Sequence, residues 1–359
     1  MPGTSLADTL LIGTGPPMLL HGLSLAEAGH RVIFVDAADR IGGAWKTRTV
    51  FGFRHVEAGV HLIENRAYLN RAVENLLGPD RLVRGPPDFG LVLGRRVPMP
   101  LARIALYGLV AGKSALRGRR EKILHSLRNF GLSLRYAGLP LVYPAGGAAE
   151  MLAATADRLA RAGARFRFET RIERIVLDGN GIAAVTADGA LRAGHLVMSS
   201  RAHAPIAGLE PLWTDCERVT THSYMLHLAG PLAPFEGYVE VVGDTTIKRA
   251  RNVTGFACPR PPPGETLLTV QLRRPPDGPE RAGTTICRRM AELGLLDPAT
   301  RLLGFASDEV TLVTLGSAAL GHIAAAHPRR LTALRTVDLG DRAYDVRPVV
   351  APDETQVGA

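Results

Sequence analysis

The sequence predicts an α/β fold in which a parallel-sheet domain carries an inserted domain of mixed α+β structure. Three observations predict it: a strand, glycine turn, helix and second strand within 9–36, a helix and strands within 143–199, and alternating strands separated by proline-rich turns within 201–320. With 359 residues, 46% of them hydrophobic and 21% charged, the chain is long enough for two domains and has an ordinary globular composition.

The first stretch has the order of a dinucleotide-binding unit. An apolar strand, Thr9–Ile12, leads into Gly13-Thr14-Gly15, and the helical run that follows ends before a second strand closed by Asp36. The glycines allow a tight turn that a pyrophosphate can approach, and the helix directs its first amides toward such a ligand. Asp36 lies 21 residues after Gly15, a spacing suited to a carboxylate that accepts hydrogen bonds from a ribose diol. We therefore predict a Rossmann-like FAD/NAD(P)-binding domain.

One position departs from this pattern. The third glycine of G-x-G-x-x-G is replaced by Met18, directly after Pro16-Pro17. Proline suits the first helical turn, but each proline also removes an amide donor that could face a phosphate. The departure predicts weakened cofactor binding.

The turn Arg40-Ile41-Gly42-Gly43 follows the acid, and at this point the chain resembles a superfamily of flavoproteins. The superfamily comprises the amine oxidases, phytoene desaturases, protoporphyrinogen oxidases and UDP-galactopyranose mutases. The resemblance implies FAD rather than NAD, with Arg40 and the glycine doublet at the diphosphate and the next residues beside the flavin. The alternative is an ordinary glycine loop after a strand. The resemblance implies these cofactor-binding residues: Gly13, Gly15, Asp36, Ala37, Arg40, Gly42, Gly43, Ala44, Trp45, Gly59 and Ile172.

The stretch from Glu57 to His61 resembles the acid-x-G-x-H segment that leads toward the flavin in the same superfamily. The resemblance implies that Gly59 and His61 are neighbours of the flavin and makes His61 the candidate catalytic residue. The alternative is a structural histidine.

A second match begins at Tyr143-Pro144-Ala145-Gly146-Gly147 and continues through an amphipathic helix and strands within 165–175. In the superfamily this order returns the chain to the FAD domain, which implies that backbone groups of Ile172 bind the adenine. Strands 182–186 and 193–199, around a turn at Asp188-Gly189, complete the return to the parallel sheet.

We expect residues 1–65 and 141–205, with part of 321–359, to form the dinucleotide-binding domain, and residues 66–140 and 206–320 to form the substrate domain. Helices are expected over 66–77 and 97–116. The second is expected to be partly buried, or else to line an apolar substrate channel or touch a membrane surface. Residues 247–249 and Arg251 either present cations to an anionic substrate or are simply solvated.

The net charge of +9, mostly from arginine, suits anionic ligands. We expect an anionic or lipid-like small-molecule substrate and no nucleic acid, because basic residues are scattered and aromatic residues make up only 5%. The three cysteines are widely spaced, and neither a metal-ligand pattern nor a nucleophile motif is present. Without a targeting segment or an apolar run of membrane-spanning length, a cytoplasmic protein without a transmembrane segment is expected.

Three functions follow. The first is an FAD-dependent oxidoreductase that transfers hydride from a substrate to flavin. The second is a nucleotide-sugar mutase-like flavoprotein. The third is a degenerate, non-catalytic relative, favoured by Met18 and by the C-terminus, where Pro348 and the short remainder after Gly340-Asp341 leave no room for the helix that closes the flavin site in the superfamily.

Overall fold

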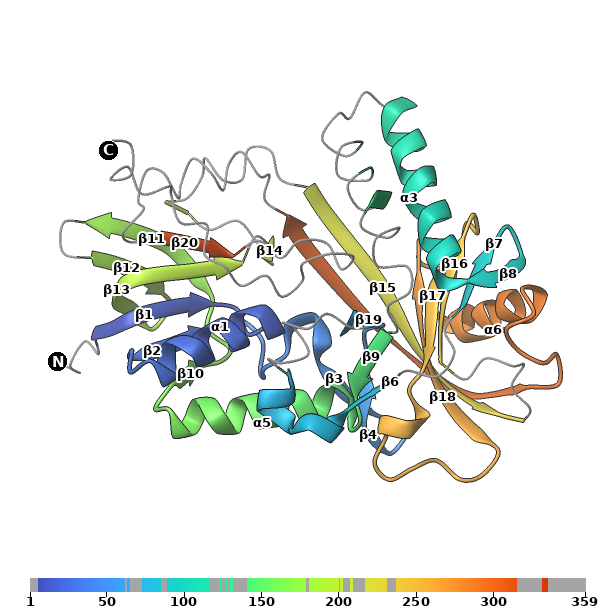
Figure 1. Ribbon diagram of the computed structural model, residues 1–359, viewed down its shortest axis with the longest axis horizontal. Coiled ribbons are helices and arrows are strands. Elements are labelled where there is room, and N and C mark those ends of the chain that lie inside the picture. Colours follow the sequence, from blue (N-terminus) through green and yellow to red (C-terminus); the bar gives the residue numbers. More distant parts are fainter. Residues whose placement is uncertain are drawn as a thin grey trace. The chain divides into compact units, whose positions relative to one another are not determined.

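The computed structural model divides into two compact units (Figure 1). The first unit lies within Met1–Ala44, Leu152–Thr220 and Thr311–Ala359, and the second within Trp45–Met151 and Thr221–Val310. The domain bounds expected from the sequence stay predictions. The structure describes residues 6–61, 63–64, 73–84, 89–116, 123, 127, 130–131, 141–178, 181–199, 201–202, 207–208, 217–230, 237–314 and 331–334.

The first unit is built on a seven-stranded sheet with the order β10-β2-β1-β13-β12-β11, in which β20 also pairs with β13. Its strands are β1 (Leu6–Ile12), β2 (Val32–Val35), β10 (Arg165–Arg167), β11 (Ile172–Asp178), β12 (Gly181–Thr186), β13 (Gly189–Ser199) and β20 (Leu331–Leu334). The β10–β2, β2–β1, β1–β13 and β13–β20 pairs are parallel, whereas β12 pairs antiparallel with β11 and β13. The predicted parallel sheet and its hairpin return are therefore confirmed.

Helix α1 (Pro16–Glu27) connects β1 to β2 and packs closely against the sheet. The residue that allows this approach is Gly22, where an added Cβ would lie 2.2 Å from Cζ of Phe34 and 3.1 Å from Cδ2 of Leu11. Gly22 lies one helical turn after Met18, on the same face of the helix. Met18 itself is only 1% exposed and belongs to the core. The close packing that the missing third glycine normally provides is thus supplied four residues later.

The second unit is built on a mixed sheet with the order β14-β19-β15-β18-β17-β16-β7-β8. Its strands are β7 (Phe89–Val92), β8 (Arg95–Pro98), β14 (Arg201–Ala202), β15 (Glu217–Ala229), β16 (Tyr238–Val242), β17 (Ile247–Asn252), β18 (Glu265–Leu272) and β19 (Arg301–Thr314). Strand β14 and one end each of β15 and β19 fall within the first unit. The β16–β7 pair is parallel, and the other printed pairs are antiparallel. The mixed sheet expected from the alternating pattern is confirmed.

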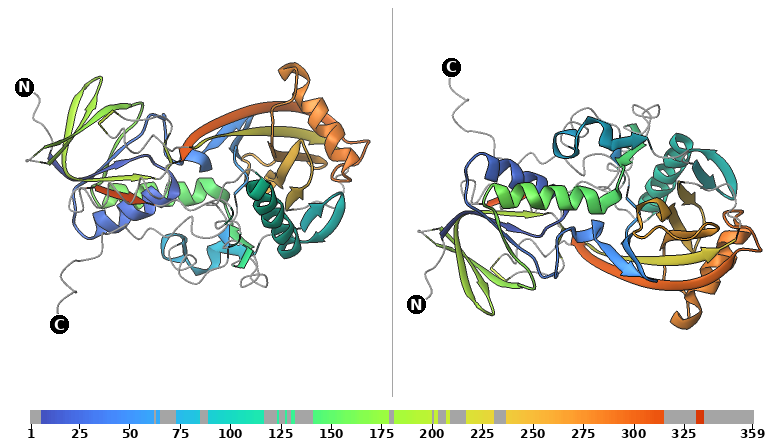
Figure 2. Two further views of the ribbon diagram at one scale, coloured as in Figure 1. Left: turned by 90° about the horizontal axis from the view of Figure 1, so that it is seen from above. Right: turned by 90° about the horizontal axis from the view of Figure 1, so that it is seen from below.

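The two faces of this sheet are covered by different elements (Figure 2). One face is apolar, and residues such as Leu226 and Val270 pack there against Ile286 and Met290 of α6 (Ala282–Glu292). The opposite face packs against the hairpin of β3 (Thr47–Val50) and β4 (Phe53–Glu57) and against the start of helix α3. Gly90 of β7 permits the α3 contact, because an added Cβ there would lie 1.9 Å from Cβ of Ala102.

Helix α3 (Met99–Leu116) confirms the helix expected over 97–116, beginning directly after Pro98. Its first turn is partly buried, whereas Leu109, Val110 and Leu116 are exposed. Within the described residues, no helix combines the length and apolarity that a bilayer crossing requires. Of the helix expected over 66–77, residues 73–77 are helical and the rest lies outside the described residues, as does the C-terminal Gly340-Asp341 segment.

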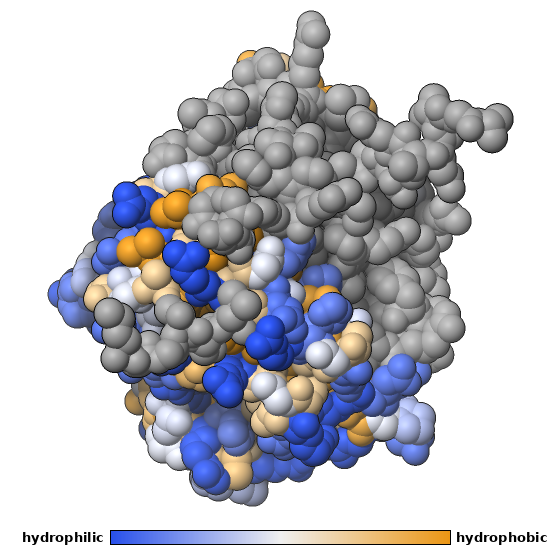
Figure 3. All heavy atoms as spheres, turned by 90° about the vertical axis from the view of Figure 1, so that its left-hand side faces the viewer, coloured by the Kyte–Doolittle hydropathy of each residue, from blue (hydrophilic) through white to orange (hydrophobic). Residues whose placement is uncertain are grey.

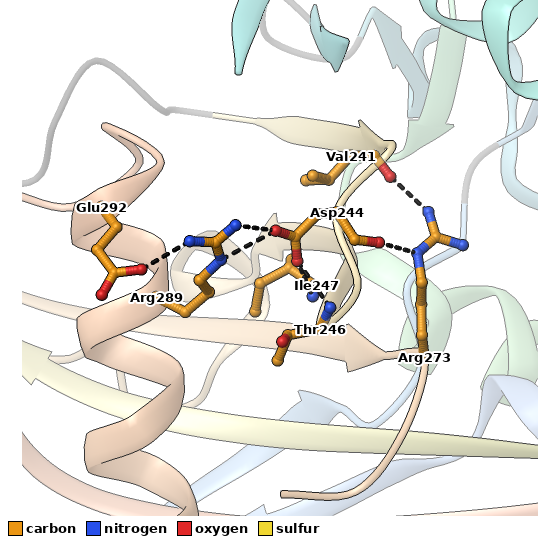
Figure 4. Close-up of polar contacts among 7 residues, drawn as sticks. All are labelled: Val241, Asp244, Thr246, Ile247, Arg273, Arg289 and Glu292. Carbon is orange, nitrogen blue, oxygen red and sulfur yellow. Dashed lines mark hydrogen bonds and ion pairs between the residues drawn. The ribbon is translucent and has the colours of Figure 1, made fainter. Parts of the chain in front are cut away.

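A polar network joins the β16–β17 turn of the second unit to α6 (Figure 4). The buried carboxylate of Asp244 accepts hydrogen bonds from the backbone N–H groups of Thr246 (2.8 Å) and Ile247 (2.6 Å) and pairs with the guanidinium of Arg289 on α6. Arg273 donates to the backbone oxygens of Asp244 (2.8 Å) and Val241 (2.6 Å). Burial raises the pKa of Asp244, but hydrogen bonds from Arg289 and the two amides outweigh it and lower the pKa overall.

The remaining elements are three short strands, a helix and four 3₁₀ turns. They are β5 (Ile63–Glu64), β6 (Leu82–Arg84), β9 (Leu141–Pro144), helix α5 (Gly147–Arg161), and the 3₁₀ turns η1 (Gly43–Trp45), η2 (Pro79–Arg81), η4 (Thr254–Phe256) and η5 (Pro279–Arg281). Helix α5 begins in the second unit and ends in the first. Figure 3 views the first unit from the end at which β1 begins, where hydrophilic residues and small apolar patches alternate over the described surface.

Candidate dinucleotide site and buried polar cluster

The glycine turn of the first unit lies between the carboxyl end of β1 and the start of α1, where ligands bind in open α/β sheets. Gly13 has a φ of +96°, which favours glycine, and its N–H donates to the carbonyl of Val35 at 2.8 Å. Gly15 is the N-cap of α1 without a side-chain capping bond. The predicted strand, turn and helix therefore occur in the expected register.

Asp36 fixes this turn. Its Oδ2 accepts hydrogen bonds from the N–H (2.8 Å) and hydroxyl (2.6 Å) of Thr14, and its Oδ1 accepts the N–H of Ala38 at 2.9 Å. The side chain is buried at the end of β2, where a carboxylate requires such partners. Asp36 therefore holds Thr14, the residue between the two glycines, in place. Thr14 was not singled out by sequence, because its hydroxyl acts only through Asp36.

The second glycine turn packs on the first. The N–H of Gly42 donates to the carbonyl of Thr14 at 3.0 Å. Gly43 has a φ of +53°, and a Cβ added to it would lie 3.1 Å from the Cα and 3.4 Å from the N of Gly15. The two turns thus meet backbone to backbone, and a side chain at position 43 would enter the space between them.

The segment before Ile172 pairs with the residues around Asp36. The N–H of Asp36 donates to the carbonyl of Arg167 (2.9 Å), and the N–H of Thr170 donates to the carbonyl of Asp36 (3.0 Å). Ile172 is buried and opens β11 two residues later. The first unit therefore brings the two glycine turns, Asp36 and the approach to Ile172 into one region.

These residues fit the diphosphate and ribose of a dinucleotide, but with few amide donors. At the start of α1, the N-cap Gly15 and the third helical residue Met18 each carry a backbone N–H group. Pro16 and Pro17 between them carry none. Arg40, expected at the diphosphate, is exposed and pairs with Asp39. Ala37 and Ala44 are also exposed. The cradle is therefore formed mainly by glycine backbone.

The second unit holds a buried polar cluster centred on Glu57, at the end of β4. Its Oε1 accepts the N–H of Ala148 in the first turn of α5 at 2.8 Å, and its Oε2 accepts the Tyr143 hydroxyl at 3.1 Å and pairs with Nη1 of Arg251 at 3.2 Å. Gly147 makes room for this carboxylate, because an added Cβ would lie 2.7 Å from Oε1 of Glu57. The acid-x-G-x-H and P-x-G-G motifs of the sequence therefore meet at one carboxylate.

Arg251 ties this cluster to His61. Its Nη1 donates to the backbone oxygen of His61 at 2.7 Å, and its guanidinium lies over the Tyr143 ring, 3.6 Å from the centroid. Burial raises the pKa of Glu57, although Arg251, the Ala148 amide and Tyr143 oppose that rise. Burial and the Glu57 charge likewise place the pKa of Tyr143 well above its ordinary value. Arg251, expected to face an anionic substrate or solvent, does neither and is buried in an ion pair.

Trp45 and His61 stack on each other in the same unit, with centroids 4.8 Å apart and an interplanar angle of 11°. Trp45 also stacks on Tyr143 at 5.9 Å. Both Trp45 and His61 are 5% exposed, and Gly59 between Glu57 and His61 is buried. The structure therefore gathers Trp45, Gly59 and His61 in the second unit. Glu57 and Tyr143 were not assigned to a site from the sequence, although each begins a motif that the sequence identified, and Arg251 was assigned only to an anionic substrate or to solvent.

Several proteins of known structure share this fold at low sequence identity. No family model and no curated protein matches the sequence. A protein of Exiguobacterium sp. 255-15 assigned as a protoporphyrinogen oxidase has a TM-score of 0.63 at 15% identity, covering 96% of this chain and 98% of that chain. Reduced UDP-galactopyranose mutase has a TM-score of 0.66 at 14% identity, covering 90% and 87%. A fatty acid isomerase from P. acnes that produces CLA has a TM-score of 0.60 at 14% identity, covering 96% and 98%.

The fold is therefore that of amine oxidase-like flavoproteins. Two proteins named in the sequence resemblance, a protoporphyrinogen oxidase and UDP-galactopyranose mutase, are among these structural neighbours, so the resemblance is confirmed at the level of the fold.

Proposed function

We propose that the protein is an FAD-dependent oxidoreductase that removes a hydride from a small-molecule substrate. The observation that carries the proposal is the backbone contact between the two glycine turns, with Gly43 placed against Gly15 and Asp36 holding the turn between them. Glycine at both positions leaves the space that a diphosphate needs. The fold shared with amine oxidase-like flavoproteins supports FAD as the dinucleotide.

The proposed cofactor set is the one stated from the sequence. In the first unit, Gly13, Gly15, Gly42 and Gly43 would hold the diphosphate through their backbone, and Asp36 would keep the first turn in shape. When bound, FAD supplies the hydride acceptor.

The second unit carries the proposed catalytic residue. Trp45 and His61 form a rigid, buried aromatic pair that would exclude water. His61 is the proposed catalytic residue, because it is the histidine of the acid-x-G-x-H segment and imidazole is a common general acid or base in enzymes. Its position depends on Arg251, which binds its backbone oxygen.

The test is the absorption spectrum of the purified protein before and after incubation with FAD. We expect an oxidised flavin spectrum that survives gel filtration. Gly43→Ala should abolish it, because the new methyl group would lie 3.1 Å from Gly15 Cα. Gly163→Ala is the matched control, since Gly163 also has a positive φ (+78°) but no atom lies within 4 Å of its added Cβ. A wild-type protein that stays colourless, or equal flavin binding by both variants, would contradict the proposal.

A non-catalytic relative is the second candidate, and a specific observation favours it. Pro16 and Pro17 remove two of the amides at the start of α1, and the Asp36 carboxylate already accepts three hydrogen bonds from the protein. Under this alternative the fold persists while the flavin is bound weakly or not at all. Stable flavin together with measurable substrate oxidation would eliminate it.

A further inference from the structure

The face of the second unit's sheet opposite α6 carries a row of polar side chains that crosses four strands. Ser223 of β15 is the register partner of Gln271 of β18, Gln271 is the partner of Arg249 of β17, and Arg249 is the partner of Glu240 of β16. Ser223, Gln271 and Glu240 are buried, and Arg249 is half-buried. We call these four residues the polar row. Buried polar side chains in a sheet need polar partners, and neighbours within the polar row supply several of them.

Within the polar row, Arg249 is held in one orientation. Nε2 of Gln271 donates to Oγ of Ser223 at 3.3 Å, and Oε1 of Gln271 accepts the Nε–H of Arg249. A bulge between Ile247 and Arg249 precedes the residue on its strand. Bulges re-aim side chains and occur often beside active sites. The guanidinium is thus held through Nε, and the two Nη groups take no part in this contact.

The Nη groups of Arg249 have no hydrogen-bond or ion-pair partner in the part of the chain that the structure describes. Glu240, its register partner, instead accepts the hydroxyl of Tyr238, and no ion pair joins Glu240 to Arg249 among these residues. Arg251 provides the contrast, because it is neutralised by Glu57 and bound to His61. Of the two arginines of β17, Arg249 is the one whose Nη groups have no partner among the described residues.

Arg249 also lies close to the proposed reaction site. It is two residues from Arg251 on the same face of β17, a distance of about 7 Å along a strand. Arg251 in turn binds the backbone oxygen of His61. An arginine fork matches a carboxylate with two parallel hydrogen bonds. A single arginine next to one glutamate suits a monoanionic carboxylate better than a dianionic phosphate, which requires several donors.

We infer that Arg249 binds the carboxylate of the substrate, which makes the substrate a carboxylic acid. The reaction of this carboxylic acid rests on the proposed oxidoreductase function, whereas its binding by Arg249 does not. Ser223 and Gln271 are positioning residues that orient the guanidinium, and Arg249 determines the substrate class.

The test measures binding of simple carboxylates by isothermal titration calorimetry. The probes are benzoate and octanoate, each compared with its neutral primary amide, and inorganic phosphate serves as a competing anion. We expect wild type to bind at least one carboxylate and neither amide, with phosphate weaker. Arg249→Gln should weaken carboxylate binding about tenfold or more, because both charge-assisted hydrogen bonds are lost.

Lys248→Gln is the matched control. It removes the same charge one residue away, in the bulge outside the polar row, and should leave carboxylate affinity unchanged. If Arg249→Gln does not fold, Arg249→Lys replaces it. That variant keeps the charge without the fork and should bind the carboxylate measurably more weakly at an unchanged melting temperature.

The inference is overturned if wild type binds neither carboxylate, if amides bind as well as acids, if phosphate binds more tightly, or if Arg249 variants bind like wild type. The flavin spectrum of each preparation is recorded beside the titration. Carboxylate binding that depends on Arg249 in a protein without flavin would overturn the proposed function alone. Flavin binding with no such dependence would overturn this inference alone.

Discussion

At the scale of single residues, the second unit contains a buried charge pair that links distant segments of the chain. Glu57 and Arg251 are separated by 194 positions in the chain, and their side chains are only 2% and 6% exposed. Breaking such a pair costs more than the pair contributes, because the remaining charge stays buried without compensation. The pair therefore acts mainly to fix where the His61 backbone and the start of α5 lie.

Glu57→Gln should destabilise the protein by about 3 kcal/mol, the usual cost of stranding a buried charge. Exchanging both partners in Glu57→Gln/Arg251→Met should recover part of that loss, since no charge is then left buried. The free energy of unfolding, measured in urea, decides this. Suppose instead that Glu57→Gln lowers the free energy of unfolding by less than about 0.5 kcal/mol, the range typical of surface substitutions. Arg251 would then not depend on Glu57 for its stability in the buried cluster.

At the scale of elements, helix α1 shows how a sequence pattern can shift without loss of the packing it serves. Met18 fills the core where a glycine is usual, and Gly22 provides the close approach to Phe34 and Leu11 one turn later. The substitution that weakens the motif therefore does not weaken the helix–sheet contact.

Gly22→Ala should destabilise the first unit by about 1 to 3 kcal/mol, because overpacking against Phe34 exceeds the gain in helix propensity. Gly108→Ala is the matched control in α3, since no atom lies within 4 Å of its added Cβ. It should stabilise by up to about 1 kcal/mol. Thermal melting of both variants measures the contrast, and stabilisation by both would refute the packing role of Gly22.

The contact between the β16–β17 turn and α6 predicts a pH dependence. The pKa of Asp244 is lower in the folded protein than in the unfolded chain. In the pH range between these two pKa values, the unfolded state therefore binds more protons than the folded state. The stabilisation is fully present above about pH 4, the unfolded value, and is lost as pH falls through the lower folded pKa.

Asp244→Asn should therefore lower stability by about 1 to 2 kcal/mol at pH 7, because the hydrogen bonds from Arg289 lose their charge assistance. Below pH 4 its difference from wild type should shrink. Melting temperatures from pH 7 down to pH 2.5 test both statements, with exposed Asp277→Asn as the control. A difference between wild type and Asp244→Asn that stays constant over this range would contradict the assignment.

At the scale of the whole molecule, the sequence predicts what is encoded locally. The β1 strand, the glycine turn and Asp36 are neighbours in sequence or separated by one helix, so apolar periodicity and glycine positions predict them. The mixed sheet was predicted in the same way. The polar cluster was not, because pairing Glu57 with Arg251 requires knowing which strand faces β4. Likewise, Arg249 and Arg251 are equivalent in the sequence, and only the structure distinguishes Arg251, which is in an ion pair, from Arg249, whose Nη groups have no partner in the described part of the chain.

The proposed cofactor contacts of the first unit predict which part of FAD stabilises the chain. The glycine turns and Asp36 all lie in the first unit, and they correspond to the diphosphate and adjoining ribose of the proposed FAD. A ligand that binds only the folded state adds about 2.7 kcal/mol of stability at one hundred times its Kd. FAD should therefore raise the melting temperature, ADP should raise it in part, and riboflavin, which lacks the diphosphate, should leave it nearly unchanged.

Differential scanning calorimetry with each compound measures these shifts, and Gly43→Ala should lose the shifts with FAD and ADP together. The order of the melting-temperature shifts among FAD, ADP and riboflavin matters more than their size, because the order reports which half of the dinucleotide the glycine turns bind. Stabilisation by riboflavin equal to that by FAD would place the main binding contacts outside the glycine turns. Since Pro16 and Pro17 remove two amides from the cradle, the ADP shift is also the direct measure of how much affinity the remaining backbone groups retain.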